Sequence, residues 1–503
     1  MDSKDDSLKK LGKGAAYVFL GVMFSKFIGY LFKFVTARLG TEQYGILSLG
    51  IMVYAVFSII LLFGFDYGIT RFTAYYLSEN SKSKVKGLIK FAFPIVFISS
   101  LIGSIVLFFA SEFIAINLFH TEQLSLVLKI FAFAVPFDCM RGVFLGVIKG
   151  FKNLKYEFYS RYLIEGSSRI LLMFLLVYLG FGIVGASIAY VVSVFLSFLF
   201  SMIFFSKTFS IFNVESEKVN QFEVFDYSWP LMFNALLGLA IVSIDSFMIG
   251  YFMTVSDVGI YNAIAPVARL TYIIPFSLSA LLVPVMVSLY VQKDEKAFSS
   301  VYDTLNRLVF MFNLPLTLFI IFFSREVLSV LFGEEYAVGY VGLIILTLGF
   351  FVMFLFMVSR EVLLALKKSR NVFYYSLVGV ILNIVLCFFM VPAYGIIGAA
   401  LASVLSLGVI SLLIFWKAFK LTRNKFFQWS YLKMVLLGLI AICVIKLLSL
   451  FYSLYNFWGL FFITLFFFLV YFGLLVVFRV INGEDKIMFR ELLSSVKGKF
   501  GFS

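Results

Sequence analysis

The sequence RLGTEQYGILSLG at residues 38–50 returns in diverged form as YFMTVSDVGIYNAIA at residues 251–265. Aligning Gly45 with Gly259 places the two glycine-isoleucine pairs at an offset of 259 − 45 = 214 residues. An offset of this size joins two segments in different halves of the chain. If it persists elsewhere in the sequence, it indicates that the protein arose from an internal duplication.

A second pair of segments keeps almost the same offset. The sequence GFGIVGASIAY at residues 180–190 resembles AYGIIGAALAS at residues 393–403, and Gly182 aligns with Gly395 at 395 − 182 = 213 residues. A third match, RGVFLG starting at residue 141 against REVLLA starting at residue 360, has an offset of 360 − 141 = 219. The matches occur in order along the chain, so we interpret them as a duplication.

The composition is that of a membrane protein. Of the 503 residues, 62% are hydrophobic and 14% are charged, and the mean hydropathy is +1.04. Continuous apolar runs, each long enough for the roughly 20 helical residues that cross a bilayer, recur along the whole sequence. We therefore predict an all-α, polytopic membrane protein with about 14 transmembrane helices.

The predicted spans have uncertain ends but clear centres. They lie at residues 15–37, 44–67, 87–110, 124–148, 156–180, 182–205, 226–250, 258–288, 305–324, 338–366, 372–392, 395–416, 431–452 and 457–480. With a cytoplasmic N-terminus, most loop lysines and arginines fall on the inner side, as the positive-inside rule requires. We expect a multi-pass protein of the cytoplasmic (inner) membrane with both termini in the cytoplasm.

Each repeat holds six spans, so both copies enter the membrane in the same direction. This predicts two six-helix lobes related by a two-fold axis along the membrane normal, with two extra C-terminal helices. The predicted divisions are residues 1–210 for the N-lobe, 211–425 for the C-lobe and 426–503 for the last two spans and a cytoplasmic tail. Rocking of such lobes opens a shared cleft to either side in turn, which is alternating access.

Charged side chains inside predicted spans are the candidate functional residues, because each costs about 2.5–3.5 kcal/mol to insert at membrane depth. Lys26 and Lys33 lie on one face of the first span, and Arg141 lies in the fourth. Arg269 lies near the middle of the eighth span. The deep acids Asp66, Asp138 and Asp245 are candidates for ion coupling, with H⁺ or Na⁺ as the ion.

The fifth predicted span carries four charges at every fourth position, with alternating sign: Glu157, Arg161, Glu165 and Arg169. This spacing is compatible with a salt-bridge ladder along one helix face that neutralises itself. It is equally compatible with a site in which Arg161 or Arg169 is offered to a ligand. Both alternatives stay open on the sequence alone.

The repeat separates functional charges from architectural ones. At the offsets above, Lys26 and Lys33 correspond to Ala240 and Phe247. Arg161, Glu165 and Arg169 correspond to three uncharged residues of the second copy, namely Tyr374, Val378 and Leu382. The fold does not need these charges, and basic groups in a cleft favour an anion, with guanidinium suited to phosphate oxygens. We therefore expect a negatively charged substrate.

Several segments resemble a known family. The sequence DSFMIG at residues 245–250, VGIYNA at residues 258–263 and RLGxxxYG at residues 38–45, with the duplicated GIxGA turns, resemble the polysaccharide and oligosaccharide flippases of the MOP (multidrug/oligosaccharidyl-lipid/polysaccharide) superfamily. The resemblance implies a two-lobed, MATE-like exporter of a polyprenyl-phosphate-linked or polyprenyl-pyrophosphate-linked glycan. Related lipid II flippases use basic residues in the first, second and eighth spans, and Lys26, Lys33 and Arg269 occupy the first and eighth here.

We therefore predict a flippase, not an enzyme, that exports a lipid-linked oligosaccharide from the cytoplasmic to the outer leaflet for surface polysaccharide or glycan synthesis. The predicted substrate contacts are Lys26, Lys33, Arg141, Arg161, Arg169 and Arg269. A lipid II flippase for cell-wall synthesis and a cation-coupled multidrug exporter remain alternatives, and a membrane glycosyltransferase is a more distant one. We expect membrane lipids as partners, a monomer, and neither a cofactor, a metal site nor a nucleic-acid partner.

Overall fold

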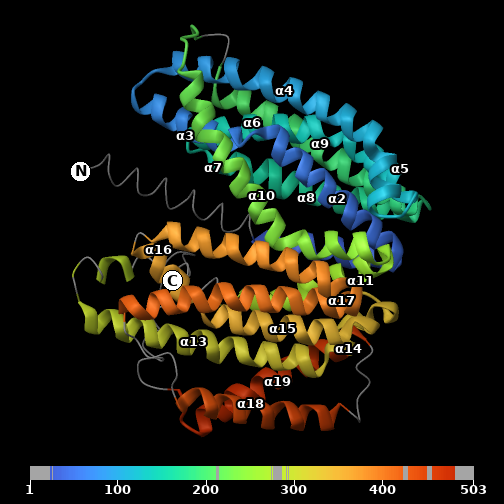
Figure 1. Ribbon diagram of the computed structural model, residues 1–503, viewed down its shortest axis with the longest axis vertical. Coiled ribbons are helices and arrows are strands. Elements are labelled where there is room, and N and C mark those ends of the chain that lie inside the picture. The colour runs from blue at the N-terminus through green and yellow to red at the C-terminus, as the bar shows by residue number, and fades with distance from the viewer. Residues whose placement is uncertain are drawn as a thin grey trace, which may run out of the picture. The chain divides into compact units, whose positions relative to one another are not determined.

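The computed structural model describes residues 23–24, 26–210, 214–273, 275, 286–289, 292, 294–366, 368–422, 429–449 and 456–481. Within these ranges the chain forms helices joined by short turns and contains no β-strand, which confirms the predicted all-α class (Figure 1). The chain divides into two compact units, Met1–Asn262 and Ala263–Ser503. The boundaries predicted for the lobes at residues 210 and 425 remain predictions.

The first unit begins with helical residues between 26 and 37 and continues through a bundle of helices. Its elements are α2 (Thr41–Leu62), α3 (Phe65–Ser78), α4 (Lys82–Phe113), η1 (Ile114–Leu118), α5 (Gln123–Ala132), α6 (Ala134–Gly150), α7 (Leu154–Glu157), η2 (Phe158–Ile164), α8 (Glu165–Tyr178), α9 (Gly182–Thr208) and α10 (Gln221–Phe252). Helix α11 (Val255–Ala268) then carries the chain across the division at Asn262 into the second unit.

The second unit continues from α11 through a short 3₁₀ turn into long apolar helices. Its elements are η3 (Arg269–Tyr272), α13 (Glu295–Phe322), α14 (Ser324–Leu331), η4 (Glu334–Gly339), α15 (Tyr340–Leu355), α16 (Met357–Ala365), α17 (Ser369–Thr422), α18 (Trp429–Leu448) and α19 (Phe457–Val477). Helices α18 and α19, which lie beyond the repeat, pack on α13.

Ten helical segments in the described part of the chain are long and apolar enough to cross a membrane. One of them covers residues 370–420 and therefore contains two predicted spans, those at residues 372–392 and 395–416. The predicted first and eighth spans lie partly outside the described residues. The total of about 14 spans and the two-fold relation of the lobes therefore remain predictions.

The duplicated glycine turns both contain a glycine with positive φ. Gly182 has φ +49° at the start of α9, and Gly395 has φ +56° where α17 bends. A positive φ is strained for residues with a side chain and free of strain for glycine. The sequence therefore marks both turns with glycine, and the break predicted between residues 392 and 395 coincides with the bend.

The small-residue face of α6 allows close helix packing in the first unit. A methyl group on Gly142 would lie 3.0 Å from Leu62, one on Gly146 would lie 3.0 Å from the carbonyl oxygen of Asp66, and one on Gly150 would lie 2.4 Å from Thr73. All three neighbours belong to α2 and α3. Because glycine has no side chain, the backbones of α6 and of these two helices approach closely.

Candidate functional site

A buried network of charges joins α6 to α8 in the first unit. The Arg141 guanidinium donates hydrogen bonds to the carboxylates of Asp138 and Glu165, and the same Glu165 accepts a hydrogen bond from Arg169. Arg141 is 7% exposed. Two acids and two bases make this group formally neutral, and direct pairing makes its charges tolerable inside an apolar bundle.

Serines on one face of α9 complete the network. Ser193 accepts a hydrogen bond from Nε of Arg169 at 3.3 Å, and Ser197 accepts one from Arg141 at 3.2 Å. Ser160 of η2 lies 2.5 Å from the hydroxyl oxygen of Ser201 and donates to the carbonyl oxygen of Ser197 at 2.8 Å. This serine face was not among the predicted site residues, although serine at every fourth position of an apolar span is a signal that the sequence contains.

Arg169 is also held by aromatic rings. Its guanidinium carbon lies 3.9 Å from the ring centre of Tyr190 and 5.8 Å from that of Phe32. A guanidinium over an aromatic face is stabilised by the ring quadrupole. Together with Glu165 and Ser193, these rings engage Arg169 on several sides.

The predicted ladder along residues 157–169 forms only in its second half. Glu165 pairs with Arg169 one α-helical turn later, but Glu157 pairs with Lys149 of α6 at 3.7 Å instead of with Arg161. The reason is the π-helical segment η2, whose wider turn changes the direction of side chains four residues apart. Arg161 is exposed and forms no hydrogen bond or ion pair with any described residue.

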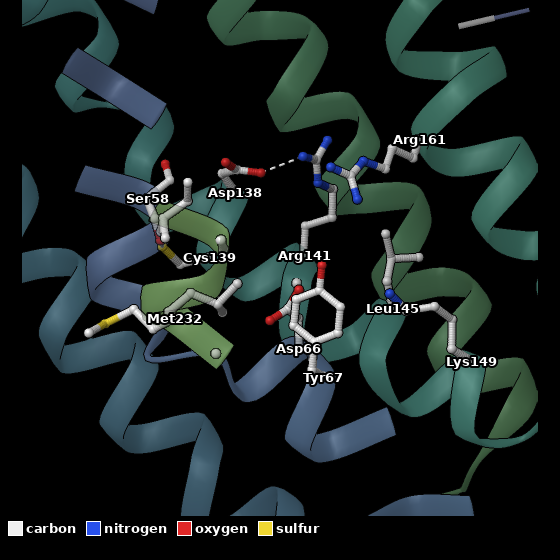
Figure 2. A pocket seen from close by; sticks show the side chains of 15 residues that line it. Ser58, Asp66, Tyr67, Asp138, Cys139, Arg141, Leu145, Lys149, Arg161 and Met232 are labelled. Carbon is white, nitrogen blue, oxygen red and sulfur yellow. Dashed lines mark hydrogen bonds and ion pairs between the residues drawn. The ribbon is translucent and has the colours of Figure 1, made fainter. Parts of the chain in front are cut away.

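A cavity of about 220 Å³ lies next to this network (Figure 2). Five charged side chains line it, contributed by α3, α6 and η2: Asp66, Asp138, Arg141, Lys149 and Arg161. Tyr67, Cys139, Leu145 and Met232 contribute ring, sulfur and aliphatic surface. Met232 and Ala235 belong to α10, so the whole cavity is built within the first unit.

Two of the charges at this cavity, Asp66 and Arg161, have opposite sign but form no close pair. Asp138 accepts a hydrogen bond from Arg141, and Lys149 forms an ion pair with Glu157, so Asp66 and Arg161 are the two charged lining residues outside these pairs. Arg161 interacts electrostatically with both Asp66 and Asp138, yet no ion pair within 4.0 Å joins it to either carboxylate. A polar guest that bridges Asp66 and Arg161 would satisfy both groups at once.

The other predicted cations lie elsewhere. Lys26 is exposed and Lys33 is half-buried, both in the helical segment that precedes α2. Arg269 begins the 3₁₀ turn η3 of the second unit, where its guanidinium carbon lies 5.9 Å from the ring centre of Phe350. A shared site for Lys26 and Arg269 remains a prediction.

The three predicted ion-coupling acids occupy different environments. Asp66 lines the cavity, and Asp138 both lines it and pairs with Arg141. Asp245 of α10 is 3% exposed and accepts a 2.7 Å hydrogen bond from the hydroxyl of Tyr261 in α11. Across the described ranges, no group of three or more His, Cys, Asp or Glu side chains is arranged to hold a metal ion.

Comparison with known protein families gives two matches. Residues 11–290 match the family described as "Polysaccharide biosynthesis protein", and residues 230–389 match the family described as "MatE". The first match covers more than half of the chain. It includes the charge network and the cavity of the first unit.

Two individual proteins are similar to this chain over most of their own length. A Shigella flexneri protein described as "Putative O-antigen transporter" is 23% identical over 396 residues, which are 76% of this chain and 91% of that protein. An uncharacterized membrane protein of Methanocaldococcus jannaschii is 22% identical over 460 residues, covering 86% of this chain and 89% of the other.

A solved structure shares the fold. The structure described as "Lipid II flippase MurJ, inward closed conformation" superposes with a TM-score of 0.68 at 18% identity, covering 94% of this chain and 99% of that one. The TM-score shows that the two chains share an architecture. At 18% identity the comparison leaves the substrate open.

Proposed function

Since this chain belongs to the polysaccharide biosynthesis protein family of the MOP transporter superfamily, we propose that it is a flippase for a lipid-linked oligosaccharide. The substrate would be a glycan joined through phosphate or pyrophosphate to a polyprenyl lipid. It would pass from the cytoplasmic to the outer leaflet of the cytoplasmic membrane, where surface polysaccharide or glycan is assembled. The name of the Shigella relative, an O-antigen transporter, supports this substrate class.

The observation that carries the proposal is the cavity of the first unit, in which basic groups sit inside an apolar bundle. Arg141, Lys149 and Arg161 all line it. Arg141 lies within the predicted span 124–148, where a charge at membrane depth costs about 2.5–3.5 kcal/mol, and Lys149 and Arg161 lie at or near the cytoplasmic ends of the predicted spans 124–148 and 156–180. Basic groups next to a water-accessible cavity favour an anionic headgroup, while the lipid tail stays in the bilayer.

The second copy of the repeat supports a functional role for Arg161 and Glu165, whereas Arg141 keeps a basic counterpart in Arg360. Tyr374 and Val378, which correspond to Arg161 and Glu165, are 56% and 49% exposed on α17. A helix of the same repeat position therefore forms with apolar side chains in their place. These two charges of the first unit are thus not required to build a membrane helix.

Transport would proceed by alternating access, with the two repeat-related bundles rocking about the substrate. The driving force would come from differential binding of substrate, ion or membrane potential to the inward and outward states. Lys26, Lys33 and Arg269 are further candidate contacts for the phosphate, and Asp66, Asp138 and Asp245 for H⁺ or Na⁺. Both termini would face the cytoplasm.

A cation-coupled multidrug exporter is the second candidate, favoured by the MatE match over residues 230–389. A cationic drug would be recognised by carboxylates and aromatic walls. The described cavity instead contains three basic side chains and two acidic ones. A lipid II flippase shares the anionic substrate chemistry and differs in the glycan, so cell-wall synthesis distinguishes it.

The test is deletion of the gene in its native host. Lipid-linked oligosaccharide, extracted and analysed by mass spectrometry, should accumulate on the cytoplasmic side, and cell-surface glycan should fall to a small fraction of its normal amount. Plasmid expression of the wild-type chain should restore both. Unchanged glycan with increased drug sensitivity would favour the exporter, and a loss of peptidoglycan with normal surface glycan would favour the lipid II flippase.

A further inference from the structure

Resting on the proposed function, we infer that the cavity of the first unit is a subsite for one anionic sugar unit of the glycan. Asp66 would accept hydrogen bonds from the sugar hydroxyls, Tyr67 would cover one face of the ring, and Arg161 would bind the anionic group. That group is a phosphate on the sugar or the carboxylate of an acidic sugar, since both present paired oxygens to a guanidinium.

The break between α2 and α3 places the first two of these side chains at the cavity. Phe63 and Gly64 both have left-handed backbone conformations, with φ +51° and +70°, and α3 begins at the next residue. A methyl group on Gly64 would lie 2.3 Å from the carbonyl oxygen of Ser228, so this turn is pressed against α10. Asp66 and Tyr67 thus lie in the first turn of α3, which borders the cavity.

The Tyr67 side chain is exposed enough to contact a ligand. It is 53% exposed although it lines a cavity inside the first unit. Sugar rings carry one or two apolar faces of C–H groups, which pack well on an aromatic ring that has a polar hydroxyl at its edge. An aromatic ring next to a carboxylate and a guanidinium is therefore suited to a carbohydrate better than to an inorganic ion alone.

Arg161 is the lining cation that is most available to bind a ligand. Arg141 already donates to Asp138, Glu165 and Ser197, whereas Arg161 extends from the π-helical segment η2 without a bonded partner among the described residues. Figure 2 shows Arg141 and Arg161 among the side chains that line the cavity. Lys149 also lines the cavity, but it already has Glu157 as an ion-pair partner at 3.7 Å.

The volume limits the guest to a small group. The cavity has a volume of about 220 Å³. Pockets for drug-sized ligands have about 300–1,000 Å³. The cavity therefore suits a single sugar ring with its charged substituent, and the rest of the glycan would lie outside it.

The test measures binding to the full-length protein in lipid nanodiscs by isothermal titration calorimetry. The probes are glucose 1-phosphate, glucuronate, glucose and inorganic phosphate. We expect a charged sugar to bind more tightly than glucose or inorganic phosphate, because only it satisfies Asp66 and Arg161 together. Preference for glucose 1-phosphate identifies a phosphate guest, and preference for glucuronate identifies an acidic sugar. Equal binding of inorganic phosphate, or no binding of either charged sugar, overturns the inference.

Matched variants assign the contacts. Arg161→Gln and Asp66→Asn should each weaken binding of the preferred sugar about tenfold or more, the effect expected for loss of a charge-assisted hydrogen bond. Tyr67→Leu should weaken it several-fold. Tyr75→Leu, at a tyrosine of α3 that is also 53% exposed and lies outside the cavity, should leave binding unchanged, as should Arg71→Gln. Equal affinity of all variants overturns the inference.

Failure of this inference and failure of the proposed function give different results. If the wild-type chain restores surface glycan in the deletion host and Arg161→Gln restores it equally well, the flippase proposal stands and the sugar subsite falls. If the wild-type chain changes neither surface glycan nor its lipid-linked precursor, the proposed function itself falls.

Discussion

Gly45 of α2 and Gly259 of α11 face one another across a helix crossing in which neither position has room for a side chain. A methyl group on Gly45 would lie 3.0 Å from the amide nitrogen of Gly259, and one on Gly259 would lie 3.1 Å from that of Gly45. Each methyl group would also meet a carbonyl oxygen, that of Val255 at 1.9 Å and that of Thr41 at 2.0 Å. The contact is reciprocal.

The crossing brings the two copies of the repeated segment together. The methyl group added to Gly259 meets Thr41, and the one added to Gly45 meets Val255. Thr41 and Val255 are repeat counterparts, because 41 + 214 = 255. Hydrogen bonds lie on both sides of it, from Ser256 to the Thr41 hydroxyl at 2.7 Å and from Tyr44 to the Asn262 carbonyl oxygen at 3.1 Å. Equivalent residues thus meet through equivalent surfaces.

The first prediction concerns this crossing. Gly45→Ala and Gly259→Ala should each destabilise the protein by at least the roughly 1–3 kcal/mol typical of overpacking, because the obstructing atoms belong to the backbone. The thermal unfolding temperature of the purified protein in detergent measures the effect. Gly238→Ala in α10 is the control, since nothing lies within 4 Å of its added methyl group. Equal unfolding temperatures for all three variants would contradict the close crossing.

The second prediction concerns Glu165, which bridges Arg141 and Arg169. Glu165→Gln removes the shared negative charge and should cost about 3–5 kcal/mol of folding free energy, as expected when a buried charge loses its partner. Removing one of the two bases as well, in Glu165→Gln with Arg169→Met, should recover part of that loss. Thermal unfolding of the two variants and the wild type provides the comparison.

Glu79→Gln is the matched control for that experiment. Glu79 pairs with Lys84 at 3.3 Å, and the two side chains are 37% and 32% exposed. Exposed pairs contribute little, so this change should have almost no effect on stability. A loss in Glu165→Gln no larger than in Glu79→Gln would mean that the buried network contributes little to stability.

The sequence predicted the architecture because its signals there are local. Apolar runs mark membrane helices whatever surrounds them, and Gly182 and Gly395 mark turns because only glycine adopts a positive φ without strain. The glycine face of α6 was recognisable for the same reason. Each of these features depends on residues that are neighbours in one helix or one turn.

The details of the site depend on neighbours from different helices, which the sequence does not pair. Glu157 and Arg161 have the spacing of an α-helical ion pair. Because η2 is π-helical, Glu157 forms its ion pair with Lys149 instead. Lys149 and Tyr67 were not among the predicted site residues, although both line the cavity. The sequence indicated basic side chains within the spans, but it could not tell which of these cations are already engaged by neighbouring acids.

The third prediction tests the bond between Asp245 and Tyr261 that joins α10 to α11. Tyr261→Phe removes the donor at 2.7 Å from a buried carboxylate and should cost about 1–3 kcal/mol in folding free energy. Chemical or thermal unfolding in detergent measures this. Tyr394→Phe, at a tyrosine that is 64% exposed, should change nothing. A neutral Tyr261→Phe would show that Asp245 is stabilised by its other neighbours.

The fourth prediction concerns Tyr471 of α19 and a proline in α13. Pro315 has no amide hydrogen, so the carbonyl oxygen of Met311, four residues earlier, lacks its usual helical donor. The hydroxyl of Tyr471 donates to this oxygen at 3.2 Å, and Tyr471 is fully buried. The bond joins α19 to α13 at the carbonyl oxygen that Pro315 leaves without an amide donor.

A double-mutant cycle tests this arrangement. Tyr471→Phe alone should destabilise the protein by about 1–3 kcal/mol, because a buried carbonyl oxygen loses the donor that Tyr471 supplies. Pro315→Ala restores an amide hydrogen that can bond Met311, so Tyr471→Phe should cost measurably less in the Pro315→Ala background. Unfolding temperatures of the four proteins give the coupling. Additive effects would mean that Tyr471 stabilises the second unit by packing alone, and that the proline and the tyrosine are independent.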